Sequence, residues 1–82
     1  DLVDVVALND AIEELAGLDD REAKVVEMKY FAGLDVAEIA GVLGVSTRTV
    51  EGDWKHARAW LRVKLGADRG MNPQRYAQIK EI

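Results

Sequence analysis

Three evenly spaced basic residues are the clearest sign of chemistry in this sequence. Arg48, Lys55 and Arg62 follow one another at intervals of seven residues. In an α-helix this interval is two turns, about 10.5 Å, so the three side chains project from nearly one line. Such a row can bind phosphates of a nucleic acid, although a solvated helix face with a Glu51–Lys55 ion pair would show a similar pattern. The spacing predicts a DNA-binding helix and leaves the solvated face as the alternative.

Residues suited to catalysis or metal binding are few. The chain has no cysteine and one histidine, His56, so neither a thiolate site nor a histidine metal cluster can form. The acidic pairs Glu13–Glu14 and Asp19–Asp20 are adjacent in sequence and point to different sides of a helix, unlike a catalytic pair of carboxylates. No glycine-rich loop followed by Lys and Ser or Thr is present. We expect no enzyme activity, no metal, no cofactor and no small-molecule substrate.

Charge divides the chain into two unlike halves. The 82 residues have a net charge of -4, with 49% hydrophobic and 32% charged residues, which is typical of one small globular domain. Residues 1–43 contain eleven acidic and three basic residues, whereas residues 44–82 contain four acidic and eight basic ones. We therefore expect a polyanion to meet the second half, and solvent or a basic protein to meet the first. No apolar run approaches the roughly 20 residues of a membrane span, so we expect no membrane partner and a cytoplasmic location. Because the first residue is Asp1 and not methionine, we expect the chain to be part of a longer protein.

Apolar residues recur every three or four positions and never alternate as in a strand, which predicts an all-α fold. We expect a four-helix bundle containing a helix-turn-helix, with a C-terminal helical extension. The expected helices cover residues 2–16, ended by Gly17, then 20–31, 36–43 and 47–65, with a final helix over residues 72–81 that begins at Asn72 and Pro73. Asp19 with Glu22, and Asp35 with Glu38, have the spacing of capping boxes, and Ser46 can cap the fourth helix. We expect residues 1–66 to form one domain and residues 67–82 a linker and short helix.

The same periodicity predicts which side chains form the core. On the fourth helix the apolar stripe includes Trp54, while Trp60 lies at its edge, where it could seal against the first helix or bind a partner. The expected core residues are Leu2, Val5, Val6, Asn9, Ile12, Leu15, Val25, Val26, Met28, Phe31, Val36, Ile39, Ala40, Leu43, Val50, Trp54, Ala57, Leu61 and Leu65.

The third and fourth helices have the pattern of a helix-turn-helix. Gly44 stands where the turn needs a left-handed residue, and Val45 and Val50 would fill the angle between the helices. Thr47, Glu51, Gly52 and Ala59 lie beside the basic row, so the outer face begins with small and polar side chains. Short residues near its start let a helix enter a major groove, and bases farther along can reach phosphates.

The stretch LDDREAKVVEMKYFAGLDVAEIAGVLGVSTRTVEGDWKHARAWL, Leu18 to Leu61, resembles region 4 of bacterial RNA polymerase sigma factors, most closely the extracytoplasmic-function type. Its most specific parts are REAKVVEMKYFAGLDVAEIA, and RTV followed by W and ARAWL. DNA-binding domains of LuxR-type regulators share a similar opening and helix-turn-helix but lack ARAWL. The resemblance implies binding of the promoter minus-35 element through the second helix of the motif, with RNA polymerase core and an anti-sigma factor as protein partners.

The resemblance also implies which residues meet DNA. It places Thr47, Arg48, Glu51, Gly52 and Lys55 at base-facing or groove-lining positions, Ser46 and Thr49 where hydroxyls can bond phosphates, and Lys29 on the preceding helix as a base toward the backbone. His56 and Arg62 complete the expected DNA-binding set. One departure stands out: relatives usually have bases directly after RTV, where this chain has Glu51, Gly52 and Asp53. Two acids there would repel phosphates, so we expect weaker DNA binding than for a typical member.

Two alternatives remain open from the sequence. The chain could be the DNA-binding domain of a LuxR-type transcription regulator, or a protein-interaction module whose weakened basic face no longer binds DNA.

Overall fold

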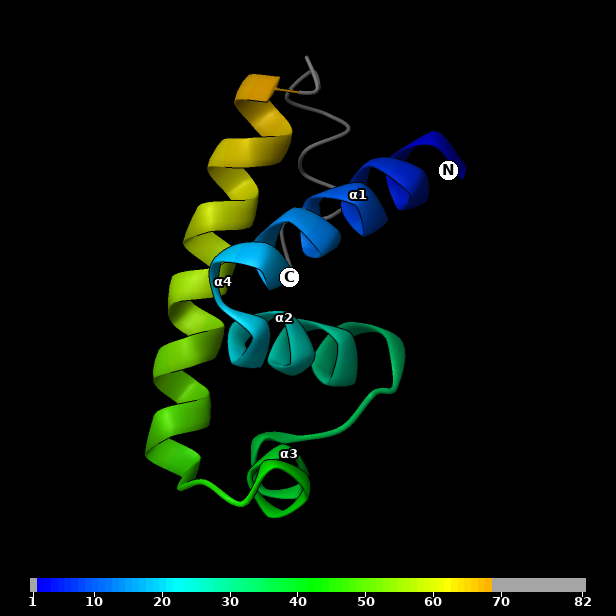
Figure 1. Ribbon diagram of the computed structural model, residues 1–82. Helices are drawn as coiled ribbons and strands as arrows, with labels where there is room; N and C mark the ends of the chain where they lie inside the picture. The colour runs from blue at the N-terminus through cyan, green and yellow to red at the C-terminus, as the bar shows by residue number, and fades with distance from the viewer. Residues whose placement is uncertain (1, 69–82) are drawn as a thin grey trace.

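The computed structural model describes residues 2–68, and in this range the chain is entirely helical, as predicted. Its elements are α1 (Leu2–Leu18), α2 (Asp20–Val26), the π-helical turn η1 (Glu27–Phe31), α3 (Val36–Leu43) and α4 (Thr47–Asp68). Helix α4 runs along one side of the molecule, and α1, α2 and α3 are arranged one after another along it (Figure 1). The helix expected over residues 72–81 lies outside the described residues.

Local side-chain contacts fix where α2, α3 and α4 begin. Asp19 accepts a hydrogen bond from the Glu22 backbone N–H at 3.1 Å, and this bond holds the pKa of the Asp19 carboxyl below its ordinary value. Asp35 and Glu38 form a complete capping box, with the Asp35 side chain accepting from the Glu38 N–H at 2.8 Å and the Glu38 side chain accepting from the Asp35 N–H at 3.0 Å. Ser46 Oγ accepts from the Thr49 N–H at 3.1 Å at the start of α4. All three predicted starts are confirmed.

Two predicted helix ends are wrong. Helix α1 continues through Gly17 to Leu18, and it ends only where the Asp19 N–H bonds to the Leu15 carbonyl and the Asp19 side chain starts the next helix. Helix α4 likewise continues through Gly66 to Asp68. A glycine weakens a helix interior by roughly 1 kcal/mol, which flanking turns that pack well can offset.

The buried side chains form two clusters. The first joins α1, α2 and the C-terminal half of α4, with Leu8, Ile12, Leu15, Leu61 and Leu65 at 2% exposure or less. The second joins α2, α3 and the start of α4, and its buried members are Val25, Ile39, Ala40 and Val50. Trp54 is half-buried and packs against both clusters.

Four core predictions fail. Val5 and Val6 are 45% and 51% exposed and Asn9 is also exposed, because the buried face of α1 includes Ala7, Leu8 and Ala11 instead, and Val5, Val6 and Asn9 lie off it. Phe31 is 52% exposed. It lies in η1, where the Ala32 N–H bonds to the Glu27 carbonyl five residues back, and the wider turn rotates the following side chains away from the α-helical face.

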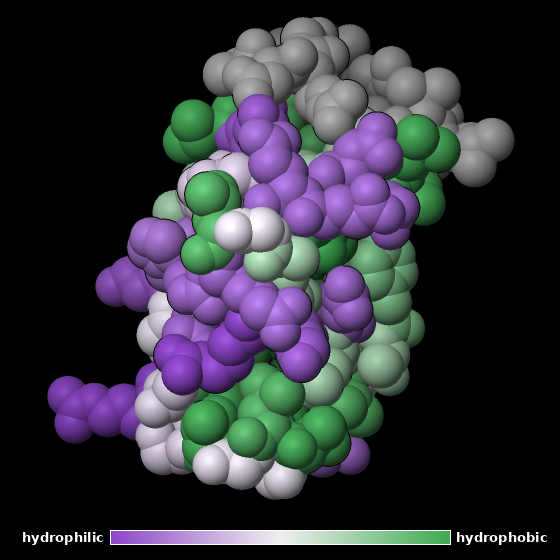
Figure 2. All heavy atoms as spheres, viewed as in Figure 1, coloured by the Kyte–Doolittle hydropathy of each residue, from purple (hydrophilic) through white to green (hydrophobic). Residues whose placement is uncertain are grey.

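One end of the molecule has a markedly apolar surface. Figure 2 shows hydrophobic residues gathered at the end where α3 lies, with hydrophilic residues dominating the middle of the same face. Val42 of α3 contributes to the exposed apolar surface and is 63% exposed.

Candidate nucleic-acid interface

The turn between α3 and α4 has the geometry of a helix-turn-helix. Gly44 adopts the left-handed conformation, with φ at 69°, and its N–H and that of Val45 both bond to the Ala40 carbonyl at 2.9 and 3.1 Å. Val50 is fully buried between the two helices, and Val45 packs against the same cluster. The turn is therefore held both by backbone bonds and by the core, which fixes the direction in which α4 leaves α3.

The first turns of α4 present small and polar residues to solvent. Thr47, Arg48, Glu51, Gly52 and Lys55 are all exposed, as expected of a face that enters a groove. A Cβ placed on Gly52 would meet no atom within 4 Å, so nothing on the protein side covers this surface. Within the described residues Glu51 forms no ion pair, and the Glu51–Lys55 pair of the alternative interpretation is not formed.

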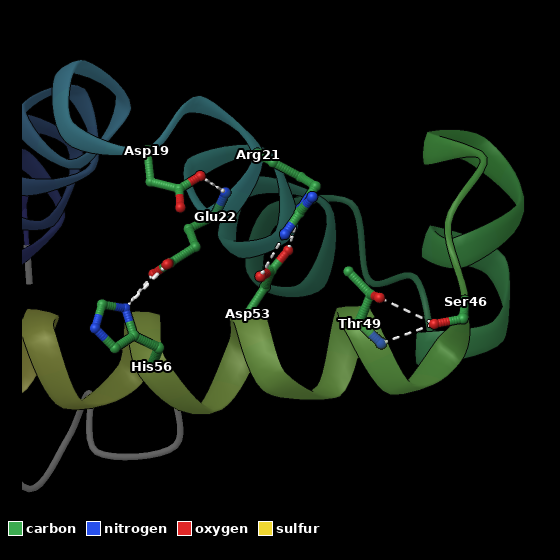
Figure 3. Close-up of polar contacts among 7 residues, drawn as sticks. All are labelled: Asp19, Arg21, Glu22, Ser46, Thr49, Asp53 and His56. Carbon is green, nitrogen blue, oxygen red and sulfur yellow. Dashed lines mark hydrogen bonds and ion pairs between the residues drawn. The ribbon is translucent and has the colours of Figure 1, made fainter.

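Ser46 and Thr49 are partners in the cap of α4. In addition to the backbone bond, the Ser46 hydroxyl donates to Thr49 Oγ1 at 3.0 Å (Figure 3). The Ser46 oxygen therefore both donates and accepts within the protein, and the Thr49 hydroxyl keeps its own proton for another acceptor.

Asp53 does not face outward, which corrects the expectation that two acids would repel phosphates. Its carboxylate is only 11% exposed and binds Arg21 of α2 through two bonds, Nε to Oδ2 at 2.5 Å and Nη2 to Oδ1 at 3.1 Å (Figure 3). The hydrogen bond to Asp53 raises the pKa of Arg21. Because position 53 lies on the inner side of α4, facing α2, this charge is neutralised inside the protein, and of the two acids Glu51 and Asp53 only Glu51 remains on the outer face.

His56 binds the buried Glu22 of α2. Its Nδ1 lies 2.7 and 2.9 Å from the two Glu22 carboxylate oxygens, while 71% of the histidine side chain is exposed (Figure 3). The hydrogen bond to Glu22 raises the pKa of His56 above its ordinary value of 6.5. Farther along α4, Lys64 Nζ contacts Glu14 of α1 at 2.8 Å. One side of α4 is thus connected to α2 through Asp53 and His56, and to α1 through Lys64.

The opposite side of α4 has basic residues without carboxylate partners. Lys29 Nζ and the Arg58 guanidinium lie 5.9 and 5.8 Å from the centre of the Trp54 ring. Lys55, Arg58, Ala59 and Arg62 line a shallow groove on the outer face of α4. Within the described residues, Lys29, Arg48, Lys55 and Arg58 form no ion pair, whereas Arg21, Lys24 and Lys64 each bind a carboxylate. The unpaired bases are those near the outer face of α4.

Residues 5–66, whose side chains are described, contain no group of three or more His, Cys, Asp or Glu that could hold a metal ion. No helix among the described residues is long and apolar enough to cross a membrane.

Comparison with known families gives a match to the model described as ECF sigma factor, over residues 1–67. The chain belongs to the ECF sigma factor family. Neither the curated proteins nor the solved structures gave a match. Sigma factors act in transcription initiation and are transcription factors, not enzymes, and the match is consistent with region 4.

In this member of the sigma factor family, the predicted DNA-facing residues do not form one uniform surface. Most of them lie on the outer face of α4, or beside it in the case of Lys29. Ser46 closes the helix cap, and His56 is turned toward Glu22. Their contacts with DNA stay predictions.

Sequence reasoning missed two residues of this sigma factor domain. Arg58 is absent from the predicted set, although it lines the same groove as Lys55 and Arg62. Its position three residues after Lys55 was a usable signal, since such positions lie on one side of a helix. Arg21 was also missed as the partner of Asp53, and nothing in the sequence spacing links two residues 32 positions apart.

Proposed function

We propose that this chain is region 4 of an ECF sigma factor and that α4 binds the minus-35 element of a promoter. The observation that carries the proposal is the distribution of the bases. Those on the inner side of α4 and on α2 are neutralised by carboxylates, whereas Arg48, Lys55 and Arg58 remain unpaired beside small exposed residues. A helix that binds in the major groove needs small, exposed side chains in its first turns, and cations beside them that are free to bind the DNA.

The roles of the individual residues follow from their places on α4. Thr47, Arg48, Glu51 and Gly52 belong to the first two turns and would face bases, with Arg48 able to bind a guanine edge. Lys55 is a turn farther along and would bind phosphate. Residues around this surface are proposed as contacts with the DNA backbone: Thr49, Lys29, His56 and Arg62 directly, and Ser46 once its hydroxyl turns from Thr49 to a phosphate.

The acidic helices α1 and α2 would face proteins rather than DNA. Exposed acids on them include Asp10, Glu13, Glu14 and Asp20, and such a surface repels phosphates and favours a basic partner. We propose RNA polymerase core as the partner, together with an anti-sigma factor, in the cytoplasm where transcription takes place. In this arrangement residues 1–66 are proposed as the DNA-binding domain, with α4 continuing past this boundary to Asp68.

Binding of the chain to a labelled promoter duplex tests the proposal, with fluorescence anisotropy measured over a range of salt concentrations. We expect the logarithm of the binding constant to fall linearly with that of the salt concentration, by about 0.9 for each phosphate contact. Lys55→Ala should weaken all sequences alike and reduce this slope by about 0.9. Arg48→Ala should cost about 1–3 kcal/mol mainly on the promoter sequence. Glu51→Lys should tighten binding, because it replaces an acid near the exposed start of α4 with a base.

Lys24→Ala is the matched control. Lys24 carries the same charge but binds Asp20 on the surface of α2, at 3.1 Å, so its removal should leave the slope unchanged. If Glu51→Lys and Lys55→Ala also leave DNA binding unchanged, while Trp60 variants abolish association with polymerase or an anti-sigma factor, the chain is a protein-interaction module instead.

A further inference from the structure

Trp54 is the meeting point of two cations from different elements. Lys29 belongs to η1 and Arg58 to α4, and the cationic groups of both lie within 6 Å of the indole centre. This distance is in the range of a cation–π interaction. Because Trp54 packs against both buried clusters, the ring is a fixed surface on which two flexible side chains are held.

The two cations lack an anion. Neither Lys29 nor Arg58 forms an ion pair with any described residue, and Arg58 Nε is buried without a hydrogen-bond partner among them. Two like charges beside one ring repel each other, and the ring quadrupole offsets this only in part. An external anion would provide the missing acceptor and remove the repulsion.

The position of Arg58 indicates which part of DNA would supply that anion. Arg58 is eleven residues from the start of α4, about 16 Å along the helix, whereas the major groove is only about 8.5 Å deep. If the first turns of α4 enter the groove, Arg58 lies beyond its depth, toward the outside of the duplex where the phosphates are. Arg58 also lines the shallow groove on the surface of α4, together with Lys55, Ala59 and Arg62. Because the side chain of Ala59 is short, a DNA strand could pass close to the helix at this point.

We propose that Arg58 and Lys29 bind the phosphate backbone of one DNA strand beside α4, and that Trp54 is the positioning residue that holds both cations ready. This inference rests on the proposed DNA-binding function, which already includes a backbone contact by Lys29; what it adds is the contact by Arg58 and the role of Trp54 in holding the two cations side by side. Long basic side chains lose rotamer freedom when they bind, and their contact with the ring restricts them beforehand. The guanidinium, with several N–H donors, is suited to phosphate oxygens.

The experiment uses a duplex recovered by wild-type protein from a random-sequence pool. We expect Lys29→Ala and Arg58→Ala each to reduce the salt slope by about 0.9, whereas Lys24→Ala leaves it unchanged. A series of duplexes with one neutral methylphosphonate each then locates the contact. At one or two neighbouring positions the substitution should weaken the wild type several-fold and the Arg58→Ala variant much less.

The role of Trp54 is tested by pairing its variants with Arg58→Ala. Phenylalanine keeps an aromatic face, so in Trp54→Phe the removal of Arg58 should still weaken binding as it does in the wild type. In Trp54→Leu that loss should be smaller, and circular dichroism establishes that each variant is folded. If the loss is the same in both backgrounds, Trp54 is not a positioning residue.

The outcomes separate this inference from the function on which it rests. If the wild type binds and Lys55→Ala reduces the slope, but Lys29→Ala and Arg58→Ala behave as Lys24→Ala does, the phosphate site is wrong and the DNA-binding function stands. If the pool yields no bound duplex even at low salt, the proposed function itself fails and the phosphate site with it.

Discussion

Replacing Gly44 by alanine should destabilise the domain by an amount that comes from the backbone alone. Gly44 has φ at 69° and ψ at 33°, and a Cβ built on it meets no atom within 4 Å, so there is no packing contribution of either sign. An L-residue in the left-handed region costs about 1–2 kcal/mol, and for a domain of this size each kcal/mol lowers Tm by about 4–8 °C. Asparagine tolerates this conformation better, so Gly44→Asn should cost less than Gly44→Ala.

Gly41→Ala provides the matched control, because it makes the same chemical change one turn earlier. Gly41 lies inside α3 at an exposed position, its φ is not positive, and a Cβ there is also without neighbours. Alanine at this place should stabilise the helix by about 0.5–1 kcal/mol. Urea unfolding followed by circular dichroism measures both variants. If Gly44→Ala loses no stability, or if Gly41→Ala loses as much, the turn does not depend on a left-handed residue and the reasoning is refuted.

Three further outcomes are expected. The raised pKa of His56 means that its bond to Glu22 stabilises the fold fully below about pH 6.5, and that this stabilisation is lost as the pH rises through the folded-state pKa of His56. The difference in unfolding free energy between wild type and His56→Ala, measured in urea, should therefore shrink as the pH is raised. A difference that does not change with pH would contradict this. Leu61→Ala should cost about 2–5 kcal/mol because Leu61 is 1% exposed, whereas Val63→Ala, at 69% exposed, should stay within about 0.5 kcal/mol in the same titration. Ser46→Ala should cost about 1 kcal/mol through loss of the α4 cap, and an unchanged Tm would argue against that bond.

The sequence predicted the fold well because short-range chemistry determines most of it. The starts of α2, α3 and α4 depend on side chains that bond to a backbone N–H three residues away, and Gly44 marks the turn by its own conformation. Such features are visible in a single sequence. The exposure of Val5 and Phe31 was missed because it depends on which side of α1 the neighbouring helices cover and on an extra residue in η1, which periodicity does not report.

The site was predicted less completely, and charge is the reason. The sequence places Asp53 on the helix expected to bind DNA, α4, but does not reveal that Arg21 of α2 neutralises its charge. It correctly predicts that His56 is exposed but does not reveal that the Glu22 carboxylate of α2 binds its ring. Pairing between distant helices decides which charges reach solvent, and it is set by the tertiary arrangement alone. The membership in the ECF sigma factor family was predictable because RTV, W and ARAWL lie within one short stretch of the chain, residues 48–61.

The division of the core into two clusters has a consequence for the order in which the domain comes apart. Helix α1 contributes only to the first cluster and α3 only to the second, while α2 and α4 contribute to both and Trp54 touches both. Helix α3 and the start of α4 can therefore open as a cooperative unit while α1 stays packed on α2 and the C-terminal half of α4, and amide hydrogen exchange would show two levels of protection. A ligand bound at the α3 end would slow exchange there first, and its influence would reach α1 only through α2, α4 and the single indole that both clusters share.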